Sequence, residues 1–412
     1  MGVVLRRACV AALVFGGSAY VALTAHVLPK LGDYPADAGP PIRALTELHI
    51  GRFLALQPMM GAASLLIRAP FAALAYAFGG GEHLAYRLGA LPCILAAAVV
   101  VAALVGRMNA RQRSLGARVM VLALVVFNPS SGVALSFGHP EELFVAALAV
   151  ATVMVAARPG RSLLAGVMLG ITLATKQWAV IVFLPVLLAA PAHRVRLGAT
   201  ALAVAAAFTV PQFLADPSSY AAHTKSLASV NNWVSPTNIW WLFAQVRWHQ
   251  FALYSLPDWV NPLPHPLIVL VGVGLGLTAL VRRRQADAHG AMELLALVLL
   301  TRCVLDSWTN EYYYVPFLLA LIARDALASR GLPLLAAFAT VMLIANFGYV
   351  PLYGGNDLIN AFNLTWTLAL VVWLGFCVLA PELTQTVRRV TVGRLLRSQR
   401  GARLASARDG LG

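Results

Sequence analysis

Four short polar interruptions between long apolar stretches carry most of the residues that could do chemistry. The first reads GDYPADAGP and holds Asp33 and Asp37, and the second ends in FGHPEE and holds His139, Glu141 and Glu142. A carboxylate can take the proton of an attacking hydroxyl, and an imidazole or further carboxylates can form hydrogen bonds with a polar ligand. Each acidic residue also has an ordinary explanation, because Asp is common in turns and Glu is common at the start of a helix.

The other two interruptions place cations beside apolar stretches. Lys176 lies in LATKQWAV, and Arg302 precedes Asp306 and Tyr312 in TRCVLDSWTNEYYYV. A cation at this depth is costly unless it is paired, so the phosphate of a substrate is a natural partner. The ordinary explanations are a lysine that reaches lipid phosphates, an ion pair between Arg302 and Asp306 one helical turn apart, and tyrosines that anchor the chain at the membrane interface.

The elements that position these residues must be membrane helices. Apolar residues make up 60% of the chain, charged residues make up 11%, and the mean hydropathy is +0.76. Many of the apolar runs are long enough to cross a hydrocarbon core of about 30 Å. We therefore predict an all-α, polytopic membrane protein with about 12 transmembrane helices, near residues 8–28, 84–106, 117–136, 142–157, 162–176, 178–191, 197–214, 265–281, 290–305, 312–323, 331–349 and 361–380.

The first outer segment, residues 29–82, is predicted to contain interfacial helices. Its apolar residues recur every three or four positions in IRALTELHIGRFLAL, as they do in an amphipathic helix. The run Met59–Phe78 holds Arg68 and Pro70 at its middle. These residues favour an amphipathic or re-entrant segment over a full span.

Residues 1–381 are predicted to form a single membrane domain, and residues 382–412 a basic cytoplasmic tail. A second long outer segment, residues 215–264, interleaves tryptophan with asparagine and histidine. That mixture suits sugar recognition and equally suits a helix at the membrane interface.

The basic residues indicate which way the loops face. Most of the 31 lysines and arginines fall in every second gap between the apolar runs, as expected for cytoplasmic loops. Both termini are then cytoplasmic, and all four polar interruptions face the outside. The net charge of +15 is explained by this topology, so we expect membrane lipids and no nucleic acid as partners. The Arg-rich, Lys-poor, Ala-rich composition suggests a high-GC bacterial genome, and the membrane is expected to be a bacterial plasma membrane.

The arrangement resembles the glycosyltransferase C superfold, and especially its family 87 of polyprenyl-phosphate-mannose-dependent mannosyltransferases. The resemblance rests on GDYPADAGP, on FNPSSGVALSFGHPEELFVAALAV and on RSLLAGVMLGITLATKQWAVIVFLP, with a weaker match in DSWTNEYYYVPFLL. At the position after the NP motif where many relatives carry a GQ-like pair, this chain has Gly138 and His139.

The resemblance implies an inverting transfer of a sugar, by default mannose, from a polyprenyl phosphate to a lipid or glycan acceptor on the outer face. The family's catalytic acidic residue belongs to the first outer loop, which assigns the base to Asp37 or Asp33, with a slight preference for Asp37. Lys176 and Arg302 would then bind the donor phosphate. Sugar or acceptor binding falls to the remaining polar residues of the interruptions, which are His139, Glu141, Glu142, Asp306 and Tyr312.

No cofactor is predicted, although two carboxylates beside a phosphate are able to hold Mg²⁺. The competing interpretation is a multispan transporter or lipid flippase, which shares this composition. Transporters place ionisable groups near the middle of the bilayer and contain internal repeats. Neither feature is evident in this sequence.

Overall fold

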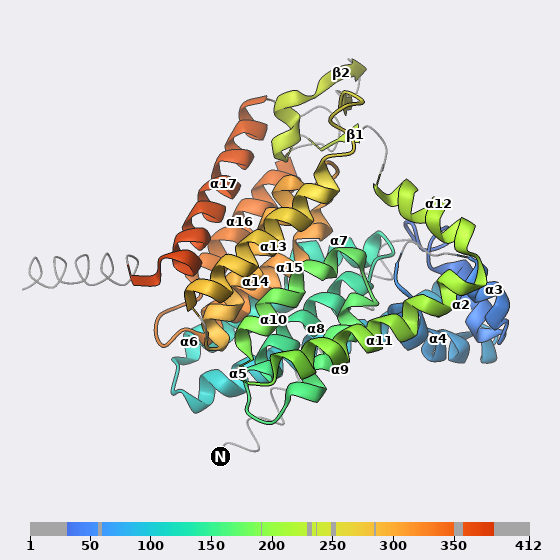
Figure 1. Ribbon diagram of the computed structural model, residues 1–412, viewed down its shortest axis with the longest axis horizontal. Helices are drawn as coiled ribbons and strands as arrows, with labels where there is room; N and C mark the ends of the chain where they lie inside the picture. Colours follow the sequence, from blue (N-terminus) through green and yellow to red (C-terminus); the bar gives the residue numbers. More distant parts are fainter. Residues whose placement is uncertain are drawn as a thin grey trace, which may run out of the picture.

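The computed structural model of the chain describes residues 31–56, 60–190, 192–228, 233–235, 237–248, 253–283, 286–349 and 357–382. The predicted first span at 8–28 and nearly all of the predicted tail at 382–412 lie outside these residues. Within them the chain forms an elongated assembly of helices with one small sheet (Figure 1).

Every other predicted span coincides with helical structure. The helices concerned are α5 (Glu82–Ala110), α6 (Leu115–Val126), α7 (Pro129–Ser136), α8 (Glu141–Ala156), α9 (Ser162–Leu173), η1 (Gln177–Val182), α10 (Phe183–Ala189), α11 (Arg194–Ala215), α13 (Pro264–Arg283), α14 (Ala288–Leu305), η3 (Glu311–Tyr314), α15 (Val315–Leu327), α16 (Leu334–Tyr349) and α17 (Asp357–Leu379). The predicted helical class is thereby confirmed.

Six helical stretches of the described chain are long and apolar enough to cross a membrane. They are α5, the continuous stretch of α6 and α7, α11, α13, α14 and α17. Shorter apolar helices include α4 (Ala62–Ala77), α9, the stretch of η1 and α10, and most of α16. The count of 12 spans is not established by these lengths and stays a prediction.

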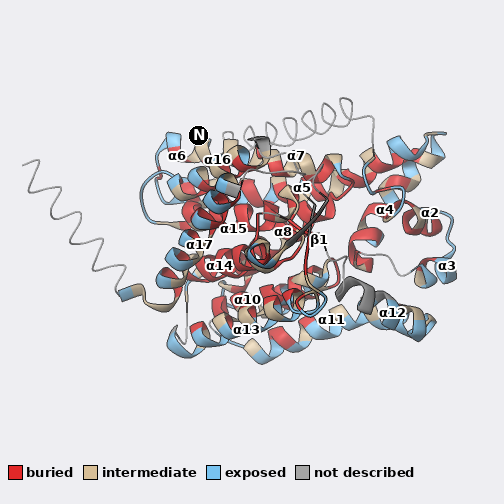
Figure 2. Cartoon of the chain, turned by 90° about the horizontal axis from the view of Figure 1, so that it is seen from above, coloured by how far each residue is buried: buried red, intermediate tan, exposed pale blue. Residues whose placement is uncertain are grey.

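The centre of the assembly is formed by α14 and α15, in which nearly every residue is buried. Both helices pack against each other and against α8. The peripheral helices α11 and α13 instead leave apolar side chains exposed, among them Leu202, Leu270 and Leu277 (Figure 2). A helix that is apolar toward the outside suits a lipid environment.

The predicted interfacial helix in the first outer segment is divided into two. It forms α2 (Gly39–Thr46) and α3 (Ile50–Ala55), separated by Leu48, whose φ is +58°. The sequence pattern missed this break because a leucine carries no turn signal. α2 packs against α4, and α4 lies along α5 (Figure 1). The buried face of α2 includes Ile42 and Leu45.

The Trp-rich segment contains the small sheet, which the sequence pattern did not predict. The elements of this segment are α12 (Pro217–Ala228), β1 (Trp233–Val234), η2 (Ile239–Phe243), β2 (Gln245–Trp248) and β3 (Leu253–Ser255). The strands pair antiparallel in the order β1-β3-β2. Strands this short offer too few alternating residues to be recognised by periodicity.

Hydrogen bonds attach this segment to the loop between α14 and η3. Asn238 Nδ2 donates to the carbonyl oxygen of Ser307 at 2.7 Å, and the Ser235 N–H donates to the same oxygen at 2.9 Å. Trp240 Nε1 donates to the carbonyl oxygen of Leu305. The Trp-rich segment therefore packs on the loop that carries Asp306 and fixes its backbone.

Candidate active site

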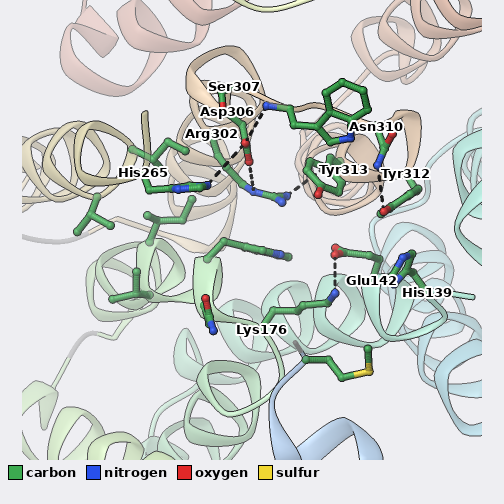
Figure 3. Close-up of a pocket in the computed structure, with 18 of the residues that line it drawn as sticks. His139, Glu142, Lys176, His265, Arg302, Asp306, Ser307, Asn310, Tyr312 and Tyr313 are labelled. Carbon is green, nitrogen blue, oxygen red and sulfur yellow. Dashed lines mark hydrogen bonds and ion pairs between the residues drawn. The ribbon is translucent and has the colours of Figure 1, made fainter. Parts of the chain in front are cut away.

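A cavity of about 610 Å³ collects side chains from all four polar interruptions. Of the predicted site residues, those that line it are Asp33, Asp37, His139, Glu142, Lys176, Arg302, Asp306 and Tyr312. Figure 3 shows His139, Glu142 and Lys176 on one wall, and Arg302 with Asp306 on another. Residues far apart in the sequence thus line one cavity.

Two glycines let the first outer loop lie directly on the corner between α7 and α8. Gly32 has φ +56° and Gly138 has φ +88°, a region that favours glycine. A Cβ on Gly32 would lie 2.4 Å from the backbone of Phe137, and one on Gly138 would lie 2.6 Å from the Tyr34 nitrogen. The Asp33 N–H donates to the Phe137 carbonyl oxygen at 3.0 Å. The two corners are therefore locked backbone to backbone.

His139 joins these corners through its side chain. Its Nε2 lies 3.1 Å from Asp33 Oδ2, and its Nδ1 lies 3.0 Å from Glu141 Oε1. The ring stacks on that of Tyr312 with 4.8 Å between centroids. Because both nitrogens face carboxylates, the arrangement favours the doubly protonated imidazolium. Burial opposes that charge, but the hydrogen bonds with Asp33 and Glu141 prevail and raise the pKa of His139 to about 9.

Glu141 lies behind the wall of the cavity and is fully buried. Its Oε2 is 3.1 Å from Arg68 Nη1, and its Oε1 is 3.0 Å from Lys176 Nζ as well as from His139. The prediction that Glu141 contacts a sugar does not match this placement, because three basic groups surround the carboxylate. The sequence could not reveal the neighbour in α4, which comes from a distant part of the chain.

Lys176 is held at the junction between α9 and η1. Its Nζ lies 3.0 Å from Glu141 and 3.2 Å from Glu142 Oε1. The backbone of this corner is fixed by the start of α4, where the Gly61 N–H donates to the Thr175 carbonyl oxygen at 2.9 Å. Two carboxylates thus offset the charge of Lys176 before any substrate binds.

Arg302 is held in a different way. Its guanidinium carbon lies 4.6 Å from the ring centroids of both Trp178 and Tyr313. Its Nε is 4.0 Å from Asp306 Oδ2, a separation longer than a hydrogen bond, and His265 Nε2 lies 3.9 Å from Asp306 Oδ1. The aromatic rings orient the planar guanidinium while leaving its charge less offset than that of Lys176.

The two candidate bases differ in their surroundings. The side chain of Asp33 is 56% exposed and accepts the hydrogen bond from His139. The carboxylate of Asp37 makes no hydrogen bond or ion pair to any residue within the described part of the chain. Burial raises the pKa of Asp37 above its ordinary value, opposed by the positive charges of His139 and Lys176. A carboxylate with a raised pKa and no partner suits a general base.

The same corner brings three potential metal ligands together. Oxygen atoms of Asp33 and Asp37 and a ring nitrogen of His139 lie within 4.8 Å of one another. A metal would require the lone pair of that nitrogen, whereas both ring nitrogens already face carboxylates. Binding would thus require His139 to lose a proton, and metal independence stays the prediction.

Sequence reasoning missed several residues in and behind this site, among them Arg68, Trp178 and His265. Arg68 was taken only as a sign of an amphipathic segment, although a lone charge in an apolar run is a recognised signal for a buried pair. Trp178 and His265 line the cavity but stood in apolar context with no distinctive spacing. The Trp-rich segment contributes Thr224 to the described lining, and its tryptophans are absent from that described set.

Fold and site define a multispan helical membrane protein with a cavity of paired carboxylates and cations beside an apolar wall. The family model for glycosyltransferase family 87 matches residues 61–307, and the chain belongs to this family. It is therefore a membrane glycosyltransferase. Comparisons with curated proteins and with solved structures gave no match. The matched range contains His139, Lys176 and Arg302, whereas Asp33 and Asp37 precede it, so their role is argued from geometry.

Proposed function

We propose that this protein transfers a sugar, by default mannose, from a polyprenyl-phosphate donor to a lipid or glycan acceptor at the outer face of the plasma membrane. The observation that carries the proposal is that Asp37 and Arg302 line one cavity. A base for the acceptor and a cation for the leaving group are the two parts that a single displacement requires.

The reaction follows from these two groups. Asp37 takes the proton of an acceptor hydroxyl. The oxygen of that hydroxyl at the same time forms a bond to the anomeric carbon. The bond from that carbon to the phosphate oxygen breaks, and its electron pair leaves with the polyprenyl phosphate. Attack from the side opposite the phosphate inverts the configuration. The phosphate is a good leaving group, so one carboxylate is sufficient and no general acid is required.

The charge pattern assigns the phosphate chiefly to Arg302. Lys176 already faces two carboxylates at 3.0 and 3.2 Å, whereas the nearest carboxylate oxygen to Arg302 among the described residues lies at 4.0 Å. A guanidinium offers a planar pair of donors to phosphate oxygens. Lys176 contributes its field from the neighbouring wall.

The apolar wall of the cavity supports a lipid donor. Val180 and Ile181 of η1 and Ile268 and Val269 of α13 line the cavity near Trp178. Val180 and Val269 are also partly exposed, and the same helix α13 leaves the apolar side chains of Leu270 and Leu277 exposed. A prenyl chain can therefore pass from the phosphate along this wall into the surrounding lipid, where its burial is favourable.

The outer-face assignment is supported by the opposite end of the assembly. At the corner between α5 and α6, which the charge pattern places in the cytoplasm, Arg111 donates to the Leu327 carbonyl oxygen and Arg113 to that of Ala326. These contacts hold the basic corner at the C-terminal end of α15, where cations are favourable. The cavity lies at the other end of α15, beside η3.

Purified protein incubated with a polyprenyl-phosphate sugar and candidate acceptors tests the proposal. We expect a new glycosidic bond and release of polyprenyl phosphate in equal amounts. Arg107→Met, a change in α5 at the end remote from the cavity, is the control and should retain transfer. Movement of the donor across sealed vesicles without any new glycosidic bond would instead favour the flippase interpretation and overturn the enzyme assignment.

A further inference from the structure

Arg68 is a charged residue that the proposed reaction leaves without a role. It lies in the middle of α4 and its side chain has no exposed surface. Its Nη1 contacts Glu141, while Nε and Nη2 have no hydrogen-bond partner among the described residues. Burying a guanidinium in this way is costly. The need of Glu141 for a counter-ion does not by itself explain the burial of Arg68, because Glu141 already contacts two other basic groups, His139 and Lys176.

The contacts of Glu141 divide between its two oxygens. Oε2 faces Arg68 at 3.1 Å, and Oε1 faces both His139 and Lys176 at 3.0 Å. Arg68 thus fixes the rotation of the carboxylate so that the other oxygen points toward the cavity wall. From there His139 reaches Asp33 at 3.1 Å. A continuous series of contacts links α4 to the first outer loop.

We propose that Arg68 is a positioning residue which, through Glu141, orients His139 and keeps Asp33 and the first outer loop against the cavity. This inference rests on the proposed function, in which Asp37 of the same loop is the base. Arg68 touches neither substrate, because Glu141 and the cavity wall lie between them. Its effect is therefore expected on catalysis more than on donor binding.

Several charged groups act on His139 from three parts of the chain. Asp33 faces it from the first loop, Glu141 from the start of α8, and Lys176 from the corner between α9 and η1. A carboxylate oxygen of Asp37 lies within 4.8 Å of a ring nitrogen of His139. The ring of Tyr312, in η3, stacks on the imidazole. Arg68 contacts Glu141 and not the ring, so its loss would free the Glu141 carboxylate to turn away from His139 and would disfavour the protonated form of the ring.

The test compares Arg68→Met and Arg68→Lys with wild type. We expect Arg68→Met to lower kcat by about tenfold or more while the KM for the donor changes little. The imidazole of His139, followed by NMR in histidine-labelled protein and assigned with His139→Gln, should titrate at lower pH in Arg68→Met, because Glu141 is no longer held toward the ring. Arg68→Lys keeps the charge and should restore the wild-type titration. A purely structural arginine would leave the titration of His139 unchanged.

A double variant separates positioning from folding. If Arg68 acts through Glu141, Arg68→Met combined with Glu141→Gln should be no less active than Glu141→Gln alone. Additive losses would overturn the inference, as would an unchanged titration in Arg68→Met. Should Arg68→Met fail to fold, Arg68→Leu, which also has no donor toward Glu141, replaces it with the same expectations.

The two readouts also distinguish the inference from the proposed function. A shifted titration of His139 together with a wild-type protein that transfers no sugar would contradict the reaction and leave the coupling from Arg68 standing. An unshifted titration together with normal transfer would contradict only the coupling.

Discussion

His139 Nε2 lies 3.1 Å from Asp33 Oδ2, so the imidazole of one corner holds the carboxylate of the first outer loop in place. The contact matters because Asp37, four residues after Asp33, has no such partner among the described residues and faces the same cavity. One aspartate positions the loop, and the other is left to react.

Activity should fall at both ends of the pH range for separate reasons. The raised pKa of Asp37 means that the base is lost, as pH decreases, at a higher pH than for an ordinary aspartate. The folded-state pKa of His139, about 9, exceeds its ordinary value of 6.5. Its contribution to loop stability is therefore complete below about 6.5 and is lost as pH rises through about 9.

The pH dependence of kcat/KM measures both groups. In His139→Gln the alkaline decrease near pH 9 should disappear, because glutamine does not titrate, while the acidic decrease remains. An alkaline decrease that persists unchanged in His139→Gln would assign it to another residue.

The close contact between loops predicts a sharp difference between two glycines of positive φ. At Gly138 an added Cβ would lie 2.6 Å from the Tyr34 nitrogen, whereas at Gly160, with φ +73°, nothing lies within 4 Å. Gly138→Ala should lower the free energy of unfolding by about 2 to 3 kcal/mol and reduce transfer. Gly160→Ala carries only the backbone penalty of about 1 kcal/mol. Equal thermal stability in the two variants would argue against the close contact.

Arg302 should be replaceable by neither glutamine nor lysine without loss. Arg302→Gln removes the cation from the leaving group and should lower kcat/KM for the donor by about 100-fold. Arg302→Lys keeps the charge but cannot fill the planar space between Trp178 and Tyr313, so it should recover only part of the loss. Steady-state kinetics with varied donor checks both, and full activity in Arg302→Gln would remove Arg302 from the phosphate site.

The sequence allowed the helices and the common side of the loops to be predicted, because apolar length and the placement of arginines follow from the bilayer itself. On this basis Lys176 and Arg302 were both expected on the outer side of the membrane. It could not show that Lys176 is paired with Glu142 while Arg302 is stacked between aromatic rings, because helix packing decides those contacts. For the same reason the partnership of Arg68 with Glu141 was not predicted. The small sheet escaped because its strands are too short.

The most direct test of the account is sugar transfer from a polyprenyl-phosphate donor by wild type, Asp37→Asn and Asp33→Asn, compared at equal amounts of folded protein. We predict that Asp37→Asn lowers kcat by about 10²- to 10⁴-fold. Asp33→Asn should lose less, since it weakens only the contact with His139. Undiminished transfer by Asp37→Asn would contradict the assignment of Asp37 as the base.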